Sequence, residues 1–152
     1  MKDYISLAMR TCAPGDQILH SAIGMVTEAA ELDSAPDRKN YLEEMGDIMW
    51  YVALGCHYLG ISLDEAEEMA TNPDDHPVMI AAGFISVLKK QIFYGKQPDR
   101  REQTALLGDM ITTLRGHATA EGVSLDWVME QNIAKLQKRY PDKFTEDRAI
   151  NR

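Results

Sequence analysis

Four carboxylates in the first third of the chain are spaced so that helices would gather them at one place. Glu28 and Glu31 form one i,i+3 pair, and Glu44 and Asp47 form a second. Residues three apart on an α-helix share a face and lie about one turn apart. The intervening segment 33–37, Asp-Ser-Ala-Pro-Asp, combines helix-stopping and helix-starting residues. We therefore expect two antiparallel helices that turn the four carboxylates toward one another.

Carboxylates that lie this close repel one another unless a cation balances their charge. Their oxygens suit hard divalent cations, and Mg²⁺ commonly divides its coordination between protein carboxylates and substrate phosphates. The pattern therefore indicates a metal-dependent phosphate site, with Mg²⁺ as the expected cofactor and Mn²⁺ as its expected substitute. A solvated acidic face is the alternative, but apolar neighbours such as Ala29, Leu32 and Ile48 place the acids within core-like helices.

The composition is that of one globular domain spanning the whole chain, with 152 residues of which 45% are hydrophobic and 26% charged. A net charge of −8 argues against a nucleic-acid binder, which needs a basic face to neutralise phosphates. No run approaches the roughly 18 apolar residues of a membrane span, and the first residues lack the apolar core of a signal peptide. Cys12 and Cys56 have no metal-ligand spacing, which fits a reduced interior. We expect a cytoplasmic protein with no nucleic-acid or membrane partner.

Apolar residues recur at helical spacing along the chain, and no segment alternates as a strand does. Ser and Asp residues provide helix starts, and Gly and Pro residues provide stops. The fold is therefore predicted to be all-α, a helical bundle. Its expected helices cover residues 4–11, 16–32, 37–59, a short stretch from 62, 78–94, 99–120 and 124 to the break at 141, followed by a polar tail at 142–152.

The sequence also repeats itself. Ten of the 33 residues from Pro36 to Glu68 are identical to the residue 62 positions later. The longer matches are Pro-Asp-Arg at 36–38 and 98–100, Gly-Asp at 46–47 and 108–109, and Ser-Leu-Asp at 62–64 and 124–126. We interpret them as two copies of one helical unit, at about 16–72 and 78–141. Chance recurrence of helix stops and caps is the weaker interpretation, because one ungapped offset covers all the matches.

The second copy lacks most of the acids. The correspondences are Glu28 with Lys90, Glu31 with Phe93, Glu44 with Leu106 and Asp47 with Asp109. We therefore expect the first copy to hold one active site. The second copy would supply scaffold and, through residues such as Lys90, positive charge.

The acidic pattern resembles a known family. The pattern is E-x-x-E, twelve further residues and E-x-x-D, and it ends in Gly-Asp-Ile-Met-Trp-Tyr at 46–51. It resembles the pattern of the MazG-like all-α nucleoside triphosphate pyrophosphohydrolases. Their superfamily includes the dimeric dUTPases and the dCTP pyrophosphatases. Shorter matches to phage and bacterial members lie at 4–11, 60–63, 89–95, 132–136 and 139–144. The tandem arrangement departs from many relatives, which are single units that dimerise. Both a monomer and a homodimer of this chain are therefore open alternatives.

The resemblance implies hydrolysis of a nucleoside triphosphate, or its deoxy form, to the monophosphate and pyrophosphate. This agrees with the site inferred from the spacing, because cleavage of a phosphoanhydride needs neutralised oxygens, an aligned water and a base. The implied metal ligands are Glu28, Glu31, Glu44 and Asp47, and the implied catalytic residues are Glu31, favoured as the base, and Glu28. Asn132 and Lys135, three residues apart on the last helix, are expected to contact sugar and phosphates. Arg139 and Lys90 are further candidates for a phosphate contact, with plain solvation of a surface cation as the alternative.

Tyr51 follows Asp47 by one helical turn, so it shares that face and is expected to stack on the base or bond to the sugar. Packing in the core is the alternative for Tyr51 and the preferred interpretation for its neighbour Trp50. A second function is also open: a helical nucleotide-binding or regulatory protein that is derived from the same family and has lost catalysis.

Overall fold

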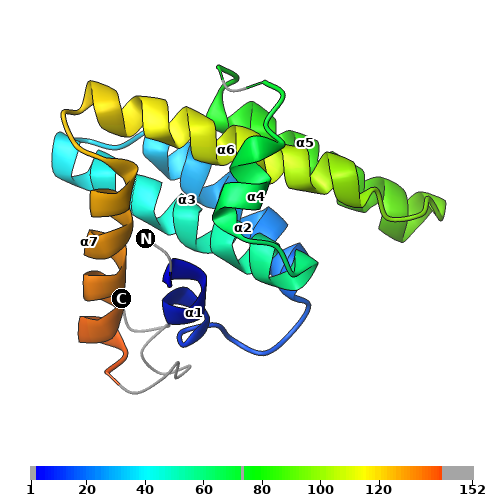
Figure 1. Ribbon diagram of the computed structural model, residues 1–152, viewed down its shortest axis with the longest axis horizontal. Coiled ribbons are helices and arrows are strands. Elements are labelled where there is room, and N and C mark those ends of the chain that lie inside the picture. The colour runs from blue at the N-terminus through cyan, green and yellow to red at the C-terminus, as the bar shows by residue number, and fades with distance from the viewer. Residues whose placement is uncertain (1–2, 73, 142–152) are drawn as a thin grey trace.

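The computed structural model describes residues 3–72 and 74–141, and over these ranges the chain is all-α (Figure 1). The described residues form seven helices and no strand, which confirms the predicted class. The helices are α1 (Tyr4–Met9), α2 (Gln17–Asp33), α3 (Arg38–Leu59), α4 (Leu63–Glu68), α5 (Pro77–Tyr94), α6 (Arg100–Ala120) and α7 (Leu125–Arg139). The predicted tail at 142–152 lies outside the described residues.

Side-chain caps begin the two acidic helices where the sequence indicates. Asp16 accepts a hydrogen bond from the backbone N–H of Leu19 at the start of α2, over 3.1 Å. Asp37 accepts one from the backbone N–H of Asn40 at the start of α3, over 2.9 Å. Gly60 ends α3 with φ 64°, a left-handed conformation that glycine adopts without strain. The short connection between α2 and α3 leaves these helices packed side by side (Figure 1).

Four long helices form the body of the molecule. α2 packs on α3 and α5, α5 packs on α6, and α6 packs on α3. α3 is the central helix, because Met45, Ile48, Met49 and Val52 along it are all 0% exposed. The acids of α2 and α3 therefore stand beside a tightly packed interface, which limits how far their backbones can move.

The shorter helices cross between the two halves of this bundle. α4 follows α3 in the chain but packs on α6, whereas α7 follows α6 but packs on α3. α7 runs steeply across the long helices, and α1 packs on both α3 and α7 (Figure 1). The crossing brings residues from the end of the chain to the half of α3 that carries Glu44 and Asp47.

The end of α5 carries exposed apolar side chains: Ile92, Phe93 and Tyr94 are 54%, 75% and 70% exposed. This end of α5 extends past the other helices at the right of Figure 1. Within the described ranges, none of the helices combines the length and the apolarity needed to cross a bilayer.

Candidate metal centre

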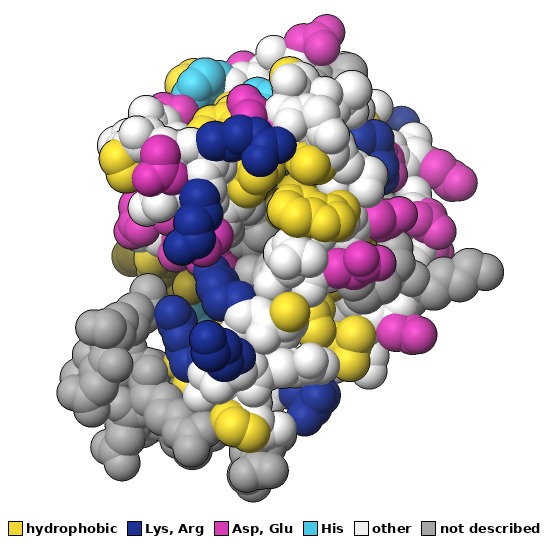
Figure 2. Space-filling model, turned by 90° about the vertical axis from the view of Figure 1, so that its left-hand side faces the viewer, with side chains coloured by type: hydrophobic (Ala, Val, Ile, Leu, Met, Phe, Trp, Pro, Cys, Tyr) yellow, Lys and Arg dark blue, Asp and Glu magenta, His cyan; other side chains and the backbone are white. Residues whose placement is uncertain are grey.

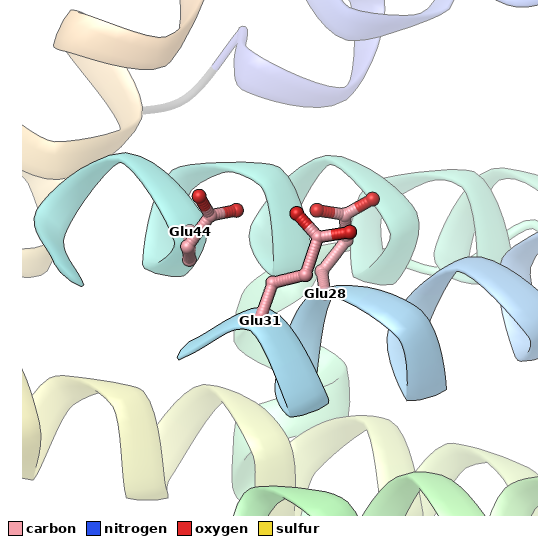
Figure 3. Close-up of side chains that lie close together, drawn as sticks. All are labelled: Glu28, Glu31 and Glu44. Carbon is pink, nitrogen blue, oxygen red and sulfur yellow. The ribbon is translucent and has the colours of Figure 1, made fainter. Parts of the chain in front are cut away.

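Three glutamates meet across the interface between α2 and α3. Glu28 and Glu31 rise from α2 and Glu44 comes from α3, and their carboxyl groups point toward one another (Figure 3). One carboxylate oxygen of each lies within 4.8 Å of the others. Glu28 and Glu44 are half-buried and Glu31 is exposed. The structure thus brings together three of the four predicted metal ligands.

The three glutamates and Asp47 form a concentration of negative charge. Burial and the nearby carboxylates of Asp47, Glu31 and Glu44 raise the pKa of Glu28 from 4.5 to about 7, and a hydrogen bond with Glu44 adds to the effect. Burial and the charges of Asp47 and Glu31 also raise the pKa of Glu44, while the hydrogen bond with Glu28 and the charge of Lys135 partly offset this rise. A divalent cation at this point would remove the repulsion and take the place of the proton on Glu28. Because every donor is a carboxylate oxygen, the site fits Mg²⁺ or Mn²⁺ better than a softer metal.

Asp47, the fourth predicted ligand, is bonded to α7. Its Oδ1 accepts hydrogen bonds from Asn132 Nδ2 at 2.8 Å and from Lys135 Nζ at 2.6 Å, and Lys135 also donates to Oδ2. Asn132 is 3% exposed, whereas the side chain of Lys135 is 26% exposed. Asn132 and Lys135 therefore lie at the predicted site and contact a predicted metal ligand. Their contact with a substrate stays a prediction.

A pocket of about 250 Å³ opens beside these carboxylates. Glu28 and Asp47 line one part of it, and the aromatic rings of His20, Trp50 and Tyr51 line another. The ring centroids of Trp50 and Tyr51 are 4.9 Å apart, and those of His20 and Tyr51 are 5.4 Å apart, both in edge-on arrangements. The pocket thus joins an acidic wall to an aromatic wall, which suits a ligand that carries both phosphate-bound metal and a flat ring.

Tyr51 reaches its place in this wall because α2 has a glycine opposite it. A Cβ at Gly24 would lie 2.1 Å from Cε1 of Tyr51, so no larger residue fits there with the ring in place. Trp50 is 8% exposed, and its Nε1 donates to the carbonyl of Ala8 at 3.1 Å and to Thr11 Oγ1 at 3.0 Å. Trp50 therefore packs mainly in the core, as expected, while half-buried Tyr51 is the more accessible ring.

The two remaining basic candidates differ in their placement. Arg139, at the end of α7, lines the pocket. Lys90 lies on α5 and is not among the described residues that line it. A phosphate contact stays a prediction for both, and the placement favours Arg139.

Positive charge gathers next to the carboxylates although the net charge is −8. Lys and Arg side chains collect on the face formed by α7 and the start of α3 (Figure 2). Within it lies a groove of about 720 Å³, whose lining includes Arg38, Lys39, Lys135 and Lys138 beside Glu43 and several apolar residues. Such a face raises the local concentration of anionic ligands beside a site that is itself acidic.

Sequence reasoning missed two residues of this region. His20 lines the pocket but was not among the residues predicted for the site; its spacing of four residues to Gly24 and of eight to Glu28 places all three on one face of α2. Tyr4 entered only through the family pattern, yet its hydroxyl donates to Asn132 Oδ1 at 3.0 Å. No local signal identifies Tyr4, because its partner lies 128 residues away in the chain.

Comparisons with protein-family models, with curated proteins and with solved structures found no match. The chemistry of the carboxylates and of the pocket is therefore what indicates a function.

Proposed function

We propose that this protein is a Mg²⁺-dependent nucleoside triphosphate pyrophosphohydrolase. The observation that carries the proposal is the meeting of Glu28, Glu31 and Glu44 within 4.8 Å of one another. Beside them lies a pocket with an aromatic wall and a nearby arginine. Phosphate-bound Mg²⁺, a sugar and a base need these three kinds of surface at one place.

The reaction joins water to one phosphorus of the α–β phosphoanhydride. A P–O bond forms to the water oxygen, the bridging P–O bond breaks with its electron pair on the departing phosphate, and one water proton passes to a carboxylate. When bound, Mg²⁺ would neutralise the phosphate oxygens and the charge that develops on the leaving group. The products are a nucleoside monophosphate and pyrophosphate.

The side chains divide this work by position. Glu31 is the exposed member of the cluster, so it is the residue that we assign as the base for water; Glu28 is a second proton acceptor and a metal ligand. Tyr51 would stack on the base, and Asn132 would meet the sugar. Lys135 and Arg139 would balance the phosphates, and Asp47 would complete the metal ligands.

We also propose the two-copy, MazG-like architecture for this chain. The helix boundaries support it: α3 begins at Arg38 and α6 at Arg100, and α4 begins at Leu63 and α7 at Leu125. Each pair of starts differs by the same 62 residues as the sequence matches. The reciprocal packing of α4 on α6 and of α7 on α3 has the same twofold character.

A non-catalytic nucleotide-binding protein is the second candidate, and one observation favours it. Asp47 bonds to Lys135 and Asn132, so one predicted ligand already has its charge balanced without a metal. A protein that uses its metal only to bind nucleotide would tolerate that arrangement.

A turnover panel separates the two candidates. Purified protein with Mg²⁺ is incubated with each common NTP and dNTP, and products are separated to distinguish monophosphate and pyrophosphate from diphosphate and phosphate. The E44Q/D47N double variant should be inactive, and E43Q is the matched control because Glu43 is an exposed neighbour on the same helix. Nucleotide-dependent stabilisation without turnover would favour the binding protein. If the nucleotides are not turned over and do not stabilise the protein, both candidates are refuted.

A further inference from the structure

A chain of hydrogen bonds leads from Tyr4 on α1 to the metal centre. Tyr4 is 0% exposed, and its hydroxyl donates to Asn132 Oδ1 at 3.0 Å. Asn132 Nδ2 in turn donates to Asp47 Oδ1 at 2.8 Å. α1, α7 and α3 each contribute one residue, and the chain ends on a predicted metal ligand.

The direction of these bonds fixes the Asn132 side chain. An amide offers one oxygen that accepts and one nitrogen that donates, whereas a carboxylate only accepts. With the phenol of Tyr4 donating to the amide oxygen, the amide nitrogen must face Asp47. An amide turned the other way would place two acceptors against each other and leave the Tyr4 proton with only the Gly46 carbonyl, 3.4 Å away.

Close packing keeps Asn132 and Tyr4 in place. A Cβ at Gly46 would lie 3.0 Å from Cβ and 3.3 Å from Nδ2 of Asn132, so the glycine lets α7 approach α3 closely. Asn132 is almost fully buried, and Tyr4 is enclosed with Ala8 of the same helix. Buried residues at such contacts have little room to change rotamer.

The two bonding partners of Asp47 therefore differ in kind. Asn132 is neutral, buried and bonded at both ends of its amide. Lys135 is charged and partly exposed on a long flexible side chain. A carboxylate has room for about four acceptor contacts, so a cation can replace Lys135 while Asn132 continues to hold Oδ1.

We propose that Tyr4 is a positioning residue of the metal centre: through Asn132, it orients Asp47 so that Asp47 joins Glu28, Glu31 and Glu44 around a divalent cation. The inference rests on the proposed metal-dependent function and extends it to the first helix. Residues that orient metal ligands in this way typically contribute a factor of about 10 to 100 to metal affinity.

The test measures Mn²⁺ binding directly, by the electron paramagnetic resonance signal of the free ion, independently of turnover. Y4F removes only the hydroxyl and is expected to weaken binding by about 10-fold. N132A removes the hydrogen bonds that link Tyr4 to Asp47 without altering α1, and it should weaken Mn²⁺ binding to at least the same extent. In a D47N background, Y4F should cause no further loss, because its effect passes through Asp47.

Y41F is the matched control, because the hydroxyl of Tyr41 shares a hydrogen bond with Nδ1 of His117 over 2.7 Å and takes no part in the bonds that link Tyr4 to Asp47. It should bind Mn²⁺ as the unmodified protein does. The inference would be overturned if Y4F and N132A bind Mn²⁺ as tightly as the unmodified protein does. It would also be overturned if Y4F lowers Mn²⁺ affinity equally in the D47N and unmodified backgrounds, or if the unmodified protein does not bind Mn²⁺. Mn²⁺ binding that follows the expected pattern without nucleotide turnover would instead refute the proposed hydrolase alone.

Discussion

Lys135 Nζ lies 2.6 Å from Oδ1 of Asp47, so a cation of the protein itself sits against one of the carboxylates predicted to bind metal. The pair joins α7 to α3, and both side chains are about a quarter exposed, at 26% and 28%. A bound divalent cation and Lys135 would therefore compete for the same carboxylate, and release of Lys135 would free its charge for a phosphate.

Replacing Lys135 should separate metal binding from turnover. In K135M, Asp47 loses its competing cation, so Mn²⁺ affinity should rise by roughly 3- to 10-fold, as for the loss of a partly exposed ion pair of about 1 kcal/mol. Turnover should fall, because the phosphates lose a counter-charge. Titration with Mn²⁺ and steady-state kinetics check the two effects, and K138M on the same helix is the control for the Mn²⁺ titration. Weaker Mn²⁺ binding in K135M would contradict the competition.

Metal binding should depend on pH through Glu28. Its pKa is raised to about 7, so between pH 5 and 7 a proton must leave before the carboxylate can bind a cation. Mg²⁺ affinity should therefore rise with pH and level off above about pH 7. Calorimetric titrations between pH 5.5 and 8 would show this, and E28Q should flatten the dependence.

The same group should affect the stability of the metal-free protein in the opposite direction. Because the folded-state pKa of Glu28 exceeds its usual value of 4.5, the folded state holds the proton more tightly than the unfolded state. The free energy of unfolding should then decrease as pH rises from about 4.5 to 7, by about 1–2 kcal/mol after allowance for partial exposure. Urea denaturation at several pH values measures it, and saturating Mg²⁺ should abolish the decrease. If the free energy of unfolding changes with pH equally in E28Q and in the unmodified protein, Glu28 is not the cause of the decrease.

Glu31 should matter for the chemical step. E31Q keeps the size of the side chain but cannot accept a proton, so kcat should fall by at least about 100-fold, the usual range for loss of a general base. Because Glu31 is also a proposed metal ligand, the comparison is made at saturating Mg²⁺, where nucleotide binding should change much less than kcat. E43Q, whose side chain pairs with Lys39 at 3.6 Å, tests for a general effect of lost charge. A kcat for E31Q close to that of E43Q would rule out Glu31 as the base.

The aromatic wall should depend on Gly24. In G24A the new methyl group would overlap the ring of Tyr51, so Tyr51 must move and stability should fall by about 1–3 kcal/mol. G116A is the matched control, since nothing lies within 4 Å of a Cβ there and alanine is the better helix former. It should be neutral or stabilising by up to about 1 kcal/mol. Thermal denaturation ranks the two, and nucleotide KM should rise only in G24A; similar behaviour of both would contradict the packing described for Tyr51.

The sequence predicted those features that depend on neighbouring residues. Asp16 and Asp37 were recognisable as helix starts because a cap bonds to a backbone N–H three residues away. The meeting of Glu28, Glu31 and Glu44 was predictable because two adjacent helices joined by a short connection must pack together.

The bonds of α7 were beyond that reasoning. Asn132 and Lys135 were expected at the site only through the family pattern, and their bonds to Asp47 span 85 and 88 residues of chain. Which residue of α7 faces α3 depends on the angle at which the helices cross, and that angle depends on Gly46 and on the fit of many side chains. Spacing along one helix carries no information about such a contact.

The crossing of α7 onto α3 links completion of the site to synthesis of the chain. The α2–α3 pair that carries the glutamates precedes α7 in the chain and is therefore synthesised first. Asp47 receives Asn132 and Lys135 only when α7 has emerged. A chain that stops before α7 would therefore carry Glu28, Glu31, Glu44 and Asp47 without the two residues that bond to Asp47, so the complete site requires synthesis through α7.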